Sequence, residues 1–168
     1  IFLRDRQIPH RRLSDDALVD QVADLLAQGN VIGWYQGRME YGPRALGNRS
    51  ILGDPRNVEM QTNMNLKIKF RESFRPFAPA VLAEKSHQVF DLEERSPYML
   101  LVGEVNQKWR CSTGGLDRGK RGLDLLKVQR SLIPAITHVD YSARVQTVHP
   151  DTNPLFHRLL ERFDQKTQ

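Results

Sequence analysis

Two amphipathic helices, one near each end of the chain, narrow the range of folds open to this sequence. Ser14 is a predicted N-cap, and the helix that follows it is expected to stop at Gly29 and Asn30. Its apolar residues recur at helical spacing: Leu18, Val22, Leu25 and Leu26. The second helix has Asn153 as its predicted cap and Pro154 in its first turn. Its apolar stripe consists of Leu155, Phe156, Leu159, Leu160 and Phe163. We therefore expect each helix to bury one face.

Short apolar runs between these helices predict strands. The runs cover residues 31–35, 77–82, 100–105, 135–140 and 143–148, and we expect the last two to pair as a hairpin. A further helix is expected over residues 57–66, and Ser86 is expected to cap a short one. Helices and strands thus alternate irregularly within 168 residues, which is the size of one domain. The predicted fold class is mixed α/β (α+β), in one domain over residues 1–168.

Composition excludes several classes of protein. Hydrophobic residues make up 39% of the chain, which argues against disorder. No apolar stretch approaches the roughly 20 residues that cross a bilayer, and the amino end carries Arg4, Asp5 and Arg6 where a signal peptide needs an apolar run. We expect a soluble, cytoplasmic protein without a membrane partner. Cys111 is the only cysteine, which excludes an internal disulfide and a cysteine-based zinc site. Because Ile1 rather than Met comes first, we expect an excerpt of a longer protein.

Positive charge is concentrated in two blocks of the chain, whose net charge is +5. Residues 38–75 hold eight Lys and Arg against four Asp and Glu, and residues 108–130 hold seven against two. The second block is rich in glycine and poor in apolar residues, which predicts a flexible basic loop over about 108–130. The first block is interleaved with Gly, Pro and aromatic residues, which favours it as the place for an anionic ligand.

Residues 37–50 are the richest candidate site. Their glycines let the backbone approach a ligand closely, and Arg38, Arg44 and Arg49 offer planar groups that match phosphate or carboxylate oxygens. The segment matches neither a Walker A loop nor the dinucleotide fingerprint. From spacing alone, solvated surface arginines remain the alternative to an anion site.

The next basic segment covers residues 65–79. If it is extended, Lys67, Lys69 and Arg71 project from one face and could cradle a phosphate. The alternative is an exposed edge strand whose lysines prevent aggregation. Arg75 lies between Phe74 and Phe77, where we expect it to be partly buried and to need an anionic partner.

A third candidate covers residues 137–144. On a strand, His138 and Asp140 would share a face, which suggests a metal or acid–base site. No third ligand is near, so a structural histidine is favoured. Ser142 and Arg144 could add a hydroxyl and a guanidinium to a phosphate site. Neither a Ser-His-Asp nucleophile nor a carboxylate pair for glycoside chemistry is evident.

Three segments resemble the C-terminal part of the O-carbamoyltransferases of the NodU/CmcH/TobZ type. They are residues 37–50 (GRMEYGPRALGNRS), 69–79 (KFRESFRPFAP) and 134–148 (PAITHVDYSARVQTV), in the family's order and spacing. The resemblance implies a YrdC-like mixed twisted sheet with flanking helices, which binds ATP and carbamoyl phosphate and forms carbamoyl adenylate. It implies that a separate, kinase-like N-terminal domain of the same protein then carbamoylates a hydroxyl of the acceptor.

The same resemblance implies roles for individual residues. It indicates four catalytic residues that line the phosphate and carbamoyl phosphate pocket: Arg44, Lys69, Arg75 and Arg144. As further contacts to the cofactor it indicates Arg49, Arg71, Ser142 and His138. Fixed cations would stabilise the charge that gathers at the transferring group, with Mg²⁺ on the polyphosphate. Residues that could orient these cations are Glu40, Asn48 and Glu72.

The sequence also departs from the family. The Asn-Thr-Ser-Phe-Asn motif that follows the family's last helix is absent, so we expect a domain truncated at its C-terminus. The family's histidine-bound iron belongs to the N-terminal domain, so we expect no metal ligands here. We therefore expect this chain alone to be unable to complete the transfer.

Two functions of other classes compete with an enzyme fragment. A nucleic-acid-binding module would agree with the pI of about 9.6 and the two basic blocks, if these formed one stripe. A structural domain with a vestigial pocket is the other. The joint presence of Arg44, Lys69, Arg75 and Arg144 favours the enzyme, and nucleic acid is not expected as the partner.

Overall fold

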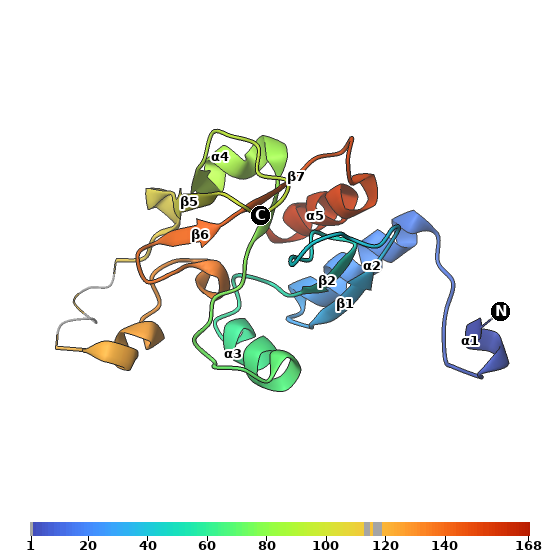
Figure 1. Cartoon of the computed structure of the whole chain (residues 1–168), viewed down its shortest axis with the longest axis horizontal. Helices are drawn as coiled ribbons and strands as arrows, with labels where there is room; N and C mark the ends of the chain where they lie inside the picture. Colours follow the sequence, from blue (N-terminus) through green and yellow to red (C-terminus); the bar gives the residue numbers. More distant parts are fainter. Residues whose placement is uncertain (1, 113–114, 116–118) are drawn as a thin grey trace.

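The computed structural model describes residues 2–112, 115 and 119–168. It confirms a mixed α/β chain, in which the described strands form three small sheets (Figure 1). The antiparallel pair is β1 (Ile32–Tyr35) with β2 (Arg49–Leu52), and the parallel pair is β3 (Ala80–Leu82) with β7 (Gln146–Val148). The three-stranded antiparallel sheet consists of β4 (Phe90–Asp91), β5 (Val102–Val105) and β6 (Ser142–Arg144).

Five α-helices and five short 3₁₀ or π turns accompany these strands in the described part of the chain. The helices are α1 (Phe2–Asp5), α2 (Asp15–Ala27), α3 (Met60–Met64), α4 (Ser86–Val89) and α5 (Pro154–Thr167). The π turn is η1 (Asn65–Lys69), and the 3₁₀ turns are η2 (Ala83–Lys85), η3 (Gln107–Trp109), η4 (Gly122–Lys127) and η5 (Pro134–Ile136). None of these helices is long and apolar enough to cross a membrane. The short α1 stands apart from the rest of the chain and buries none of its residues (Figure 1).

The two helices expected from periodicity are α2 and α5, and they pack against each other. Both predicted caps are confirmed: the Ser14 side chain accepts from the Ala17 amide, and the Asn153 side chain accepts from the Phe156 amide. Their apolar faces build one hydrophobic cluster, which buries Val19, Val22, Ala23, Leu26, Trp34, Val148, Phe156 and Leu159. Ion pairs join the exposed rims, for example Arg162 with Asp20 at 3.2 Å, and contribute little each because water screens them.

A second hydrophobic cluster lies under the three-stranded sheet. It buries Met60, Met64, Phe90, Leu92, Val105, Ile133, Ala135, Ile136, Ala143 and Val145. The last two come from the β6–β7 segment, whose later residue Val148 belongs to the first cluster. This single segment therefore ties both clusters together.

The predicted hairpin is wrong. The segment 135–140 forms η5 and a turn instead of a strand, and β6 and β7 pair with different partners, β5 and β3. Tyr141 has a left-handed backbone (φ 65°), and the amide of His138 donates to the carbonyl of Ser142 at 2.8 Å. The chain thus turns tightly just before β6, which leaves no length for a second strand.

Two smaller expectations also need correction. The helix expected over residues 57–66 begins at Met60 and continues into η1, so that Lys67 and Lys69 lie on a π turn and not on an extended segment. Ser86 begins α4 but does not cap it, because its hydroxyl donates to the carbonyl of Ala83.

Candidate anion site

Residues 37–50, which follow β1 and include the first two residues of β2, form the arginine loop. Glu40 organises its backbone: one carboxylate oxygen accepts from the amides of Leu46, at 2.7 Å, and Asn48, at 3.0 Å. The loop therefore curls around its own carboxylate. This contact gives Glu40 a role in shaping the loop, where the sequence suggested that it orients a cation.

Side-chain amides fasten the arginine loop to the start of α5. Oδ1 of Asn48 accepts from Gln36 and from Asn153, at 3.3 and 3.2 Å, and Gln36 also donates to the Asn153 side chain at 2.6 Å. The buried Gln146 of β7 donates to the carbonyl of Leu46 at 2.7 Å. Asn48 also donates to the backbone carbonyl of Arg38 at 3.2 Å, so it anchors the loop and contacts no guanidinium group among the described residues.

Gly47 lets the arginine loop approach α5 closely. Its φ is +105°, and a Cβ at this position would lie 2.3 Å from Cδ1 of the buried Phe156. Real Cβ atoms do not come that near to a ring, so only glycine fits without a shift. This contact with the first hydrophobic cluster therefore adds to the hydrogen bonds that hold the loop against α5.

Arg44 of the arginine loop and Arg144 at the end of β6 form the arginine pair. Burial, and then the positive charge of Arg44, lower the pKa of Arg144 below its ordinary value, and no carboxylate contributes. The Nε atoms of both residues are buried and have no hydrogen-bond partner within the described part of the chain. Arg144 makes one weak side-chain contact, from Nη2 to Sδ of Met99 at 3.8 Å.

Two half-buried guanidinium groups, each with a buried and unpartnered Nε atom, are unfavourable unless an anion joins them. Arginine stays protonated in proteins, so the pair cannot relieve the repulsion by losing a proton. A phosphate or carboxylate that accepts from both residues would form short, charge-assisted hydrogen bonds and offset the cost of burial. The arrangement is therefore that of an anion site.

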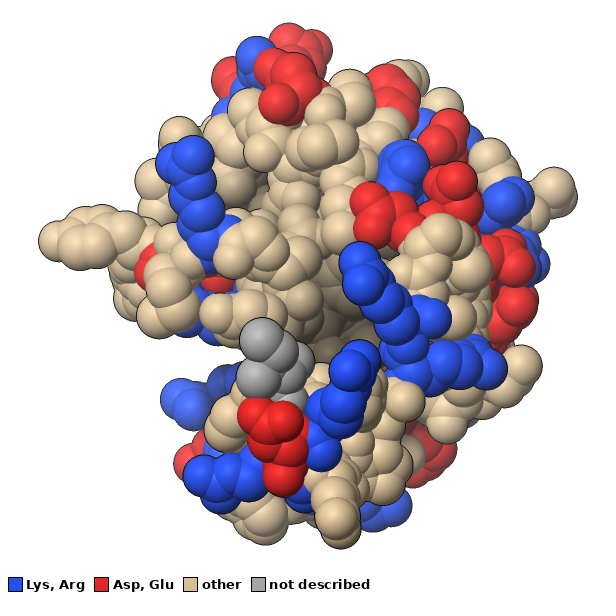
Figure 2. Space-filling view, turned by 90° about the vertical axis from the view of Figure 1, so that its right-hand side faces the viewer, with Lys and Arg blue, Asp and Glu red and all other residues tan. Residues whose placement is uncertain are grey.

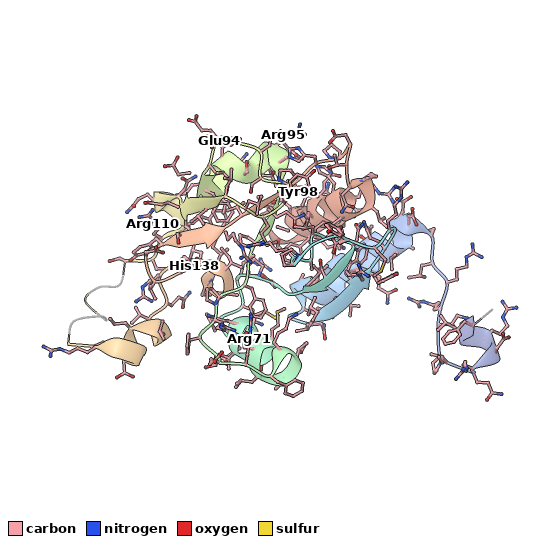
Figure 3. All side chains as sticks on the ribbon, in the orientation of Figure 1. Arg71, Glu94, Arg95, Tyr98, Arg110 and His138 are labelled. Carbon is pink, nitrogen blue, oxygen red and sulfur yellow. The ribbon has the colours of Figure 1, made fainter. Side chains whose placement is uncertain are left out.

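The other basic segment is shaped by Asn65, a fully buried residue at the start of η1. Its side-chain NH₂ donates to the carbonyls of Ser73 and Arg75, at 3.0 and 2.8 Å, and its Oδ1 accepts from Nε of Arg71 at 2.6 Å. Arg71 also lies over the Phe77 ring, 5.0 Å from its centroid, beside α3 (Figure 3). Arg71 is thus used to hold the segment in place.

The remaining predicted cations of this segment are at the surface. Lys69 is exposed at the end of η1. The expected burial of Arg75 is wrong, because 55% of its side chain is exposed. The expected anionic partner is confirmed: Arg75 pairs with Glu72, which is 60% exposed, at 3.6 Å. The buried Asn65 donates a hydrogen bond to the backbone carbonyl of Arg75, and the side chain of Arg75 remains at the surface.

Arg49 begins β2 and lies over the ring of Tyr35, its partner in β1, at 6.0 Å from the centroid. It also contacts the sulfur of Met39. The structure therefore brings together Arg44 and Arg144, whereas Arg49, Arg71 and Arg75 each have a local partner.

His138, Asp140 and Ser142 form a hydrogen-bonded turn before β6. The Ser142 hydroxyl lies 2.7 Å from Oδ1 of Asp140 and 3.1 Å from Nδ1 of His138. Hydrogen bonds from the side chain and backbone of Ser142 lower the pKa of Asp140 below its usual value. The described residues contain no group of three or more His, Cys, Asp or Glu that could hold a metal ion.

The basic block 108–130 is described only in part, since residues 113, 114 and 116–118 lie outside the described residues. Arg110 pairs with Glu104 at 2.7 Å, and Arg130 donates to the carbonyls of Val128 and Leu125. On the face shown in Figure 2, Lys and Arg side chains border a hollow and acidic side chains lie near them, so this face carries no continuous basic stripe.

Sequence reasoning missed Asn65 and Gln146, which position the two basic segments. Both are buried polar residues that donate to backbone carbonyls, Asn65 to Ser73 and Arg75, 8 and 10 residues along the chain, and Gln146 to Leu46, 100 residues away. No short pattern signals such a contact. Gly47 could be noticed in the sequence as a glycine in a loop. Nothing in the sequence indicated that Phe156, more than 100 residues later, would pack against it.

Comparisons with known proteins agree with the three resembling segments. The family model described as Carbamoyltransferase C-terminus matches residues 23–168. Over 92% of its length the chain is 41% identical to nodulation protein NolO of Bradyrhizobium diazoefficiens, and over 96% it is 39% identical to a 3'-hydroxymethylcephem-O-carbamoyltransferase of Amycolatopsis lactamdurans. It is 58% identical, over 92% of its length, to the uncharacterized protein sll1178 of Synechocystis. The chain spans 25%, 27% and 25% of these three relatives.

Proposed function

This chain belongs to the carbamoyltransferase C-terminus family, and we propose that its arginine pair binds the anionic substrates of carbamoyl transfer, carbamoyl phosphate and ATP. The observation that carries the proposal is the pair itself: the Nε atoms of Arg44 and Arg144 are buried and have no partner among the described residues, and the positive charge of Arg44 helps to lower the pKa of Arg144. Each substrate offers phosphate oxygens that would accept from both guanidinium groups.

The proposed reaction forms carbamoyl adenylate. Water first attacks the phosphorus of carbamoyl phosphate and breaks its bond to the carbamoyl oxygen, which releases inorganic phosphate and leaves carbamate. A carbamate oxygen then attacks the α-phosphorus of ATP. The bond from that phosphorus to the bridging oxygen of the β-phosphate breaks, and pyrophosphate leaves with the electron pair. This step brings several negative charges together, and positioned cations are the main means of stabilising them.

Individual residues would divide this work. The arginine pair would hold the phosphoryl group that reacts, and the exposed Lys69 and Arg75 would approach the outer phosphates. Arg49, Arg71, Ser142 and His138 would support the site, Arg71 by holding its segment against Asn65 and Phe77. Mg²⁺ would be held by the phosphates of ATP, because the described residues offer no ligand cluster of their own.

The rest of the reaction would belong to the remainder of a longer protein. Since the chain spans about a quarter of its relatives, a kinase-like N-terminal domain with its own iron site would pass the carbamoyl group to a hydroxyl of the acceptor. We propose that this takes place in the cytoplasm, where ATP and carbamoyl phosphate are made.

Calorimetric titration of this chain with carbamoyl phosphate, and separately with ATP and Mg²⁺, tests the proposal. Removing one guanidinium by Arg44→Ala or Arg144→Ala should weaken binding by about 10- to 100-fold, the effect of losing charge-assisted hydrogen bonds. Arg144→Lys keeps the charge but not the planar group, so it should restore only part of the affinity.

Arg12→Ala is the matched control, because Arg12 is an exposed arginine outside the loop and should bind like the parent. Binding that is equally strong in Arg44→Ala, Arg144→Ala and the control would refute the assignment of the arginine pair. If all three variants weaken binding to the same extent, and if added salt abolishes it, the anions bind by general attraction to the positively charged surface and not at the arginine pair.

A further inference from the structure

The guanidinium group of Arg144 meets an uncharged side chain. Its Nη2 atom lies 3.8 Å from Sδ of Met99, a residue that is 8% exposed. A thioether sulfur is a weak hydrogen-bond acceptor and carries no charge. It can therefore hold the guanidinium group in one place and leave the positive charge free for an anion, whereas a carboxylate in its place would neutralise that charge.

Met99 has a strained backbone. Its φ is 56°, in the left-handed region that is unfavourable for a residue with a Cβ. Such a conformation persists only where the surrounding structure holds it. The residues that hold Met99 therefore also determine where Arg144 lies.

Residues 96–101, which we call the strap, hold Met99 in this conformation. The hydroxyl of Ser96 donates to the carbonyl of Val145 at 2.8 Å, and the carbonyl of Leu101 accepts from the amide of Val145 at 3.1 Å. Val145 directly follows Arg144 in the chain. Both ends of the strap are thus fixed to the neighbour of Arg144, with Met99 between them.

Ser96 makes most of the bonds of the strap, and it is 3% exposed. Its amide donates to Oγ1 of Thr147 at 2.8 Å, and its carbonyl accepts from the amide of Thr147 at 3.0 Å. Within the strap, its hydroxyl oxygen accepts from the amide of Leu101 at 3.3 Å, and its carbonyl accepts from the amide of Met99 at 3.4 Å. Ser96 therefore joins the turn that contains Met99 to the segment that carries Arg144.

We propose that Ser96 is a positioning residue of the anion site: it holds Met99 against Arg144, so that the guanidinium group is in place before an anion binds. The inference rests on the proposed function, in which Arg144 is a ligand of the anion. A long side chain that has to be ordered on binding weakens the affinity. A chain that orders Arg144 in advance avoids this loss.

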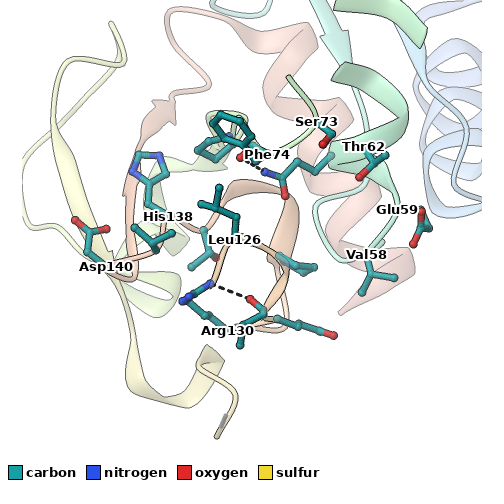
Figure 4. A pocket seen from close by; sticks show the side chains of 16 residues that line it. Val58, Glu59, Thr62, Ser73, Phe74, Leu126, Arg130, His138 and Asp140 are labelled. Carbon is teal, nitrogen blue, oxygen red and sulfur yellow. Dashed lines mark hydrogen bonds between the residues drawn. The ribbon is translucent and has the colours of Figure 1, made fainter. Parts of the chain in front are cut away.

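The strap is separate from the pocket between α3 and residues 126–140 (Figure 4). That pocket has a volume of about 830 Å³, and the described residues that line it include neither the strap nor Arg44 nor Arg144. A change at Ser96 therefore leaves the lining residues of this pocket unchanged. We expect its effect on anion binding to arise at the arginine pair.

Calorimetric titration of Ser96→Ala with carbamoyl phosphate tests the inference. The variant loses the hydroxyl and keeps the backbone bonds of the strap, and its affinity should be about two- to tenfold weaker, the effect of ordering one long side chain on binding. Ser86→Ala is the matched control, because Ser86 is also buried and donates its hydroxyl to a backbone carbonyl, at the start of α4. The control should bind like the parent, and an equal loss of affinity in both variants overturns the inference.

Two further measurements distinguish positioning from a general loss of structure. Added to Arg144→Ala, Ser96→Ala should weaken binding no further, because its effect acts through Arg144. The NMR order parameter of the Nε–H bond of Arg144, measured without ligand, should fall in Ser96→Ala and stay unchanged in Ser86→Ala. An unchanged order parameter in Ser96→Ala, or an equal loss of affinity with and without Arg144, contradicts the inference.

A second variant covers the case in which Ser96→Ala does not fold, which thermal unfolding reveals. Met99→Leu keeps an apolar side chain of similar size but removes the sulfur. It should lower both the order parameter of Arg144 and the affinity, and parent-like values of both overturn the inference.

Arg144→Ala separates this inference from the proposed function. If Arg144→Ala binds carbamoyl phosphate like the parent, the proposed function is refuted and the inference falls with it. If Arg144→Ala binds weakly while Ser96→Ala binds like the parent, the proposed function stands and the inference alone is overturned.

Discussion

Replacing Gly47 with alanine should destabilise the chain through two separate effects. The backbone there has φ +105°, which costs a residue with a Cβ about 1 kcal/mol or more. The new methyl group would also lie 2.3 Å from Cδ1 and 2.7 Å from Cε1 of Phe156. Phe156 is 1% exposed and sits in the first hydrophobic cluster, so it cannot swing away. Overpacking of this kind costs about 1–3 kcal/mol, and we expect a total of about 2–4 kcal/mol.

Two other glycines separate these effects. Gly42 has φ +121° but nothing within 4 Å of an added Cβ, so Gly42→Ala should show the backbone effect alone, about 1–2 kcal/mol. Gly33 of β1 has open space and no left-handed backbone, so Gly33→Ala should be neutral or stabilise by up to about 1 kcal/mol. From the most to the least stable, the three variants should therefore rank Gly33→Ala, Gly42→Ala and Gly47→Ala.

Urea unfolding followed by circular dichroism measures the free energy of each variant, provided that the slopes agree. The double variant Gly47→Ala with Phe156→Leu adds a further check. Leucine is smaller than the ring that the methyl group would touch, so the two changes together should destabilise less than their sum. The reasoning is refuted if Gly47→Ala is no less stable than Gly42→Ala, or if the two changes are additive.

Two further predictions concern buried polar side chains. Burial, and then the guanidinium of Arg95, lower the pKa of His149 below its usual 6.5. Because the unfolded chain therefore binds a proton more readily than the folded chain, the free energy of unfolding should fall as pH drops below about 6.5 toward the folded pKa. Urea unfolding at pH 7.5 and 5.5 should show this fall, and the exposed-residue control His10→Gln should keep it while His149→Gln reduces it; an equal fall in both would contradict the assignment. Asn65→Ala removes the three side-chain bonds to Ser73, Arg75 and Arg71 and should destabilise by about 2–3 kcal/mol. Its helical neighbour Asn63, changed in the same way, should have an effect below about 1 kcal/mol, and a similar loss of stability in both would mean that Asn65 does not organise the segment.

Local signals in the sequence determined which elements could be predicted. The caps Ser14 and Asn153 and the apolar stripes of α2 and α5 lie within a few residues of one another, so the pattern alone located both helices. Strand partners are set by contacts far apart in the chain. That β7 would pair in parallel with β3, about 65 residues earlier, is not visible in any short window, and the hairpin prediction failed for this reason.

The candidate site shows the same division. The arginine loop was recognisable from its composition and from the resemblance, and the structure places Arg44 beside Arg144. The sequence did not show that the segment after α3 forms a π turn instead of an extended strand. Phe70 adopts a left-handed backbone (φ 49°) that ends η1, and Asn65 then folds the chain back, which leaves Arg75 at the surface. An alternating pattern of charges describes an extended strand and a π turn equally well.

Among the described residues, no carboxylate pairs with the arginine pair, because of how the arginine loop uses its acid. Glu40 is the only carboxylate in residues 37–50, and it accepts two backbone amides of the same loop. The loop is held against α5 by Gln36, Asn48 and Asn153, which are uncharged. The described part of the fold therefore positions two cations with no carboxylate between them, and Arg44 lowers the pKa of Arg144. An anion that accepts hydrogen bonds from both arginines offsets the repulsion between their charges. The charge-assisted hydrogen bonds that the two guanidinium groups do not make within the chain would then contribute to the free energy of anion binding.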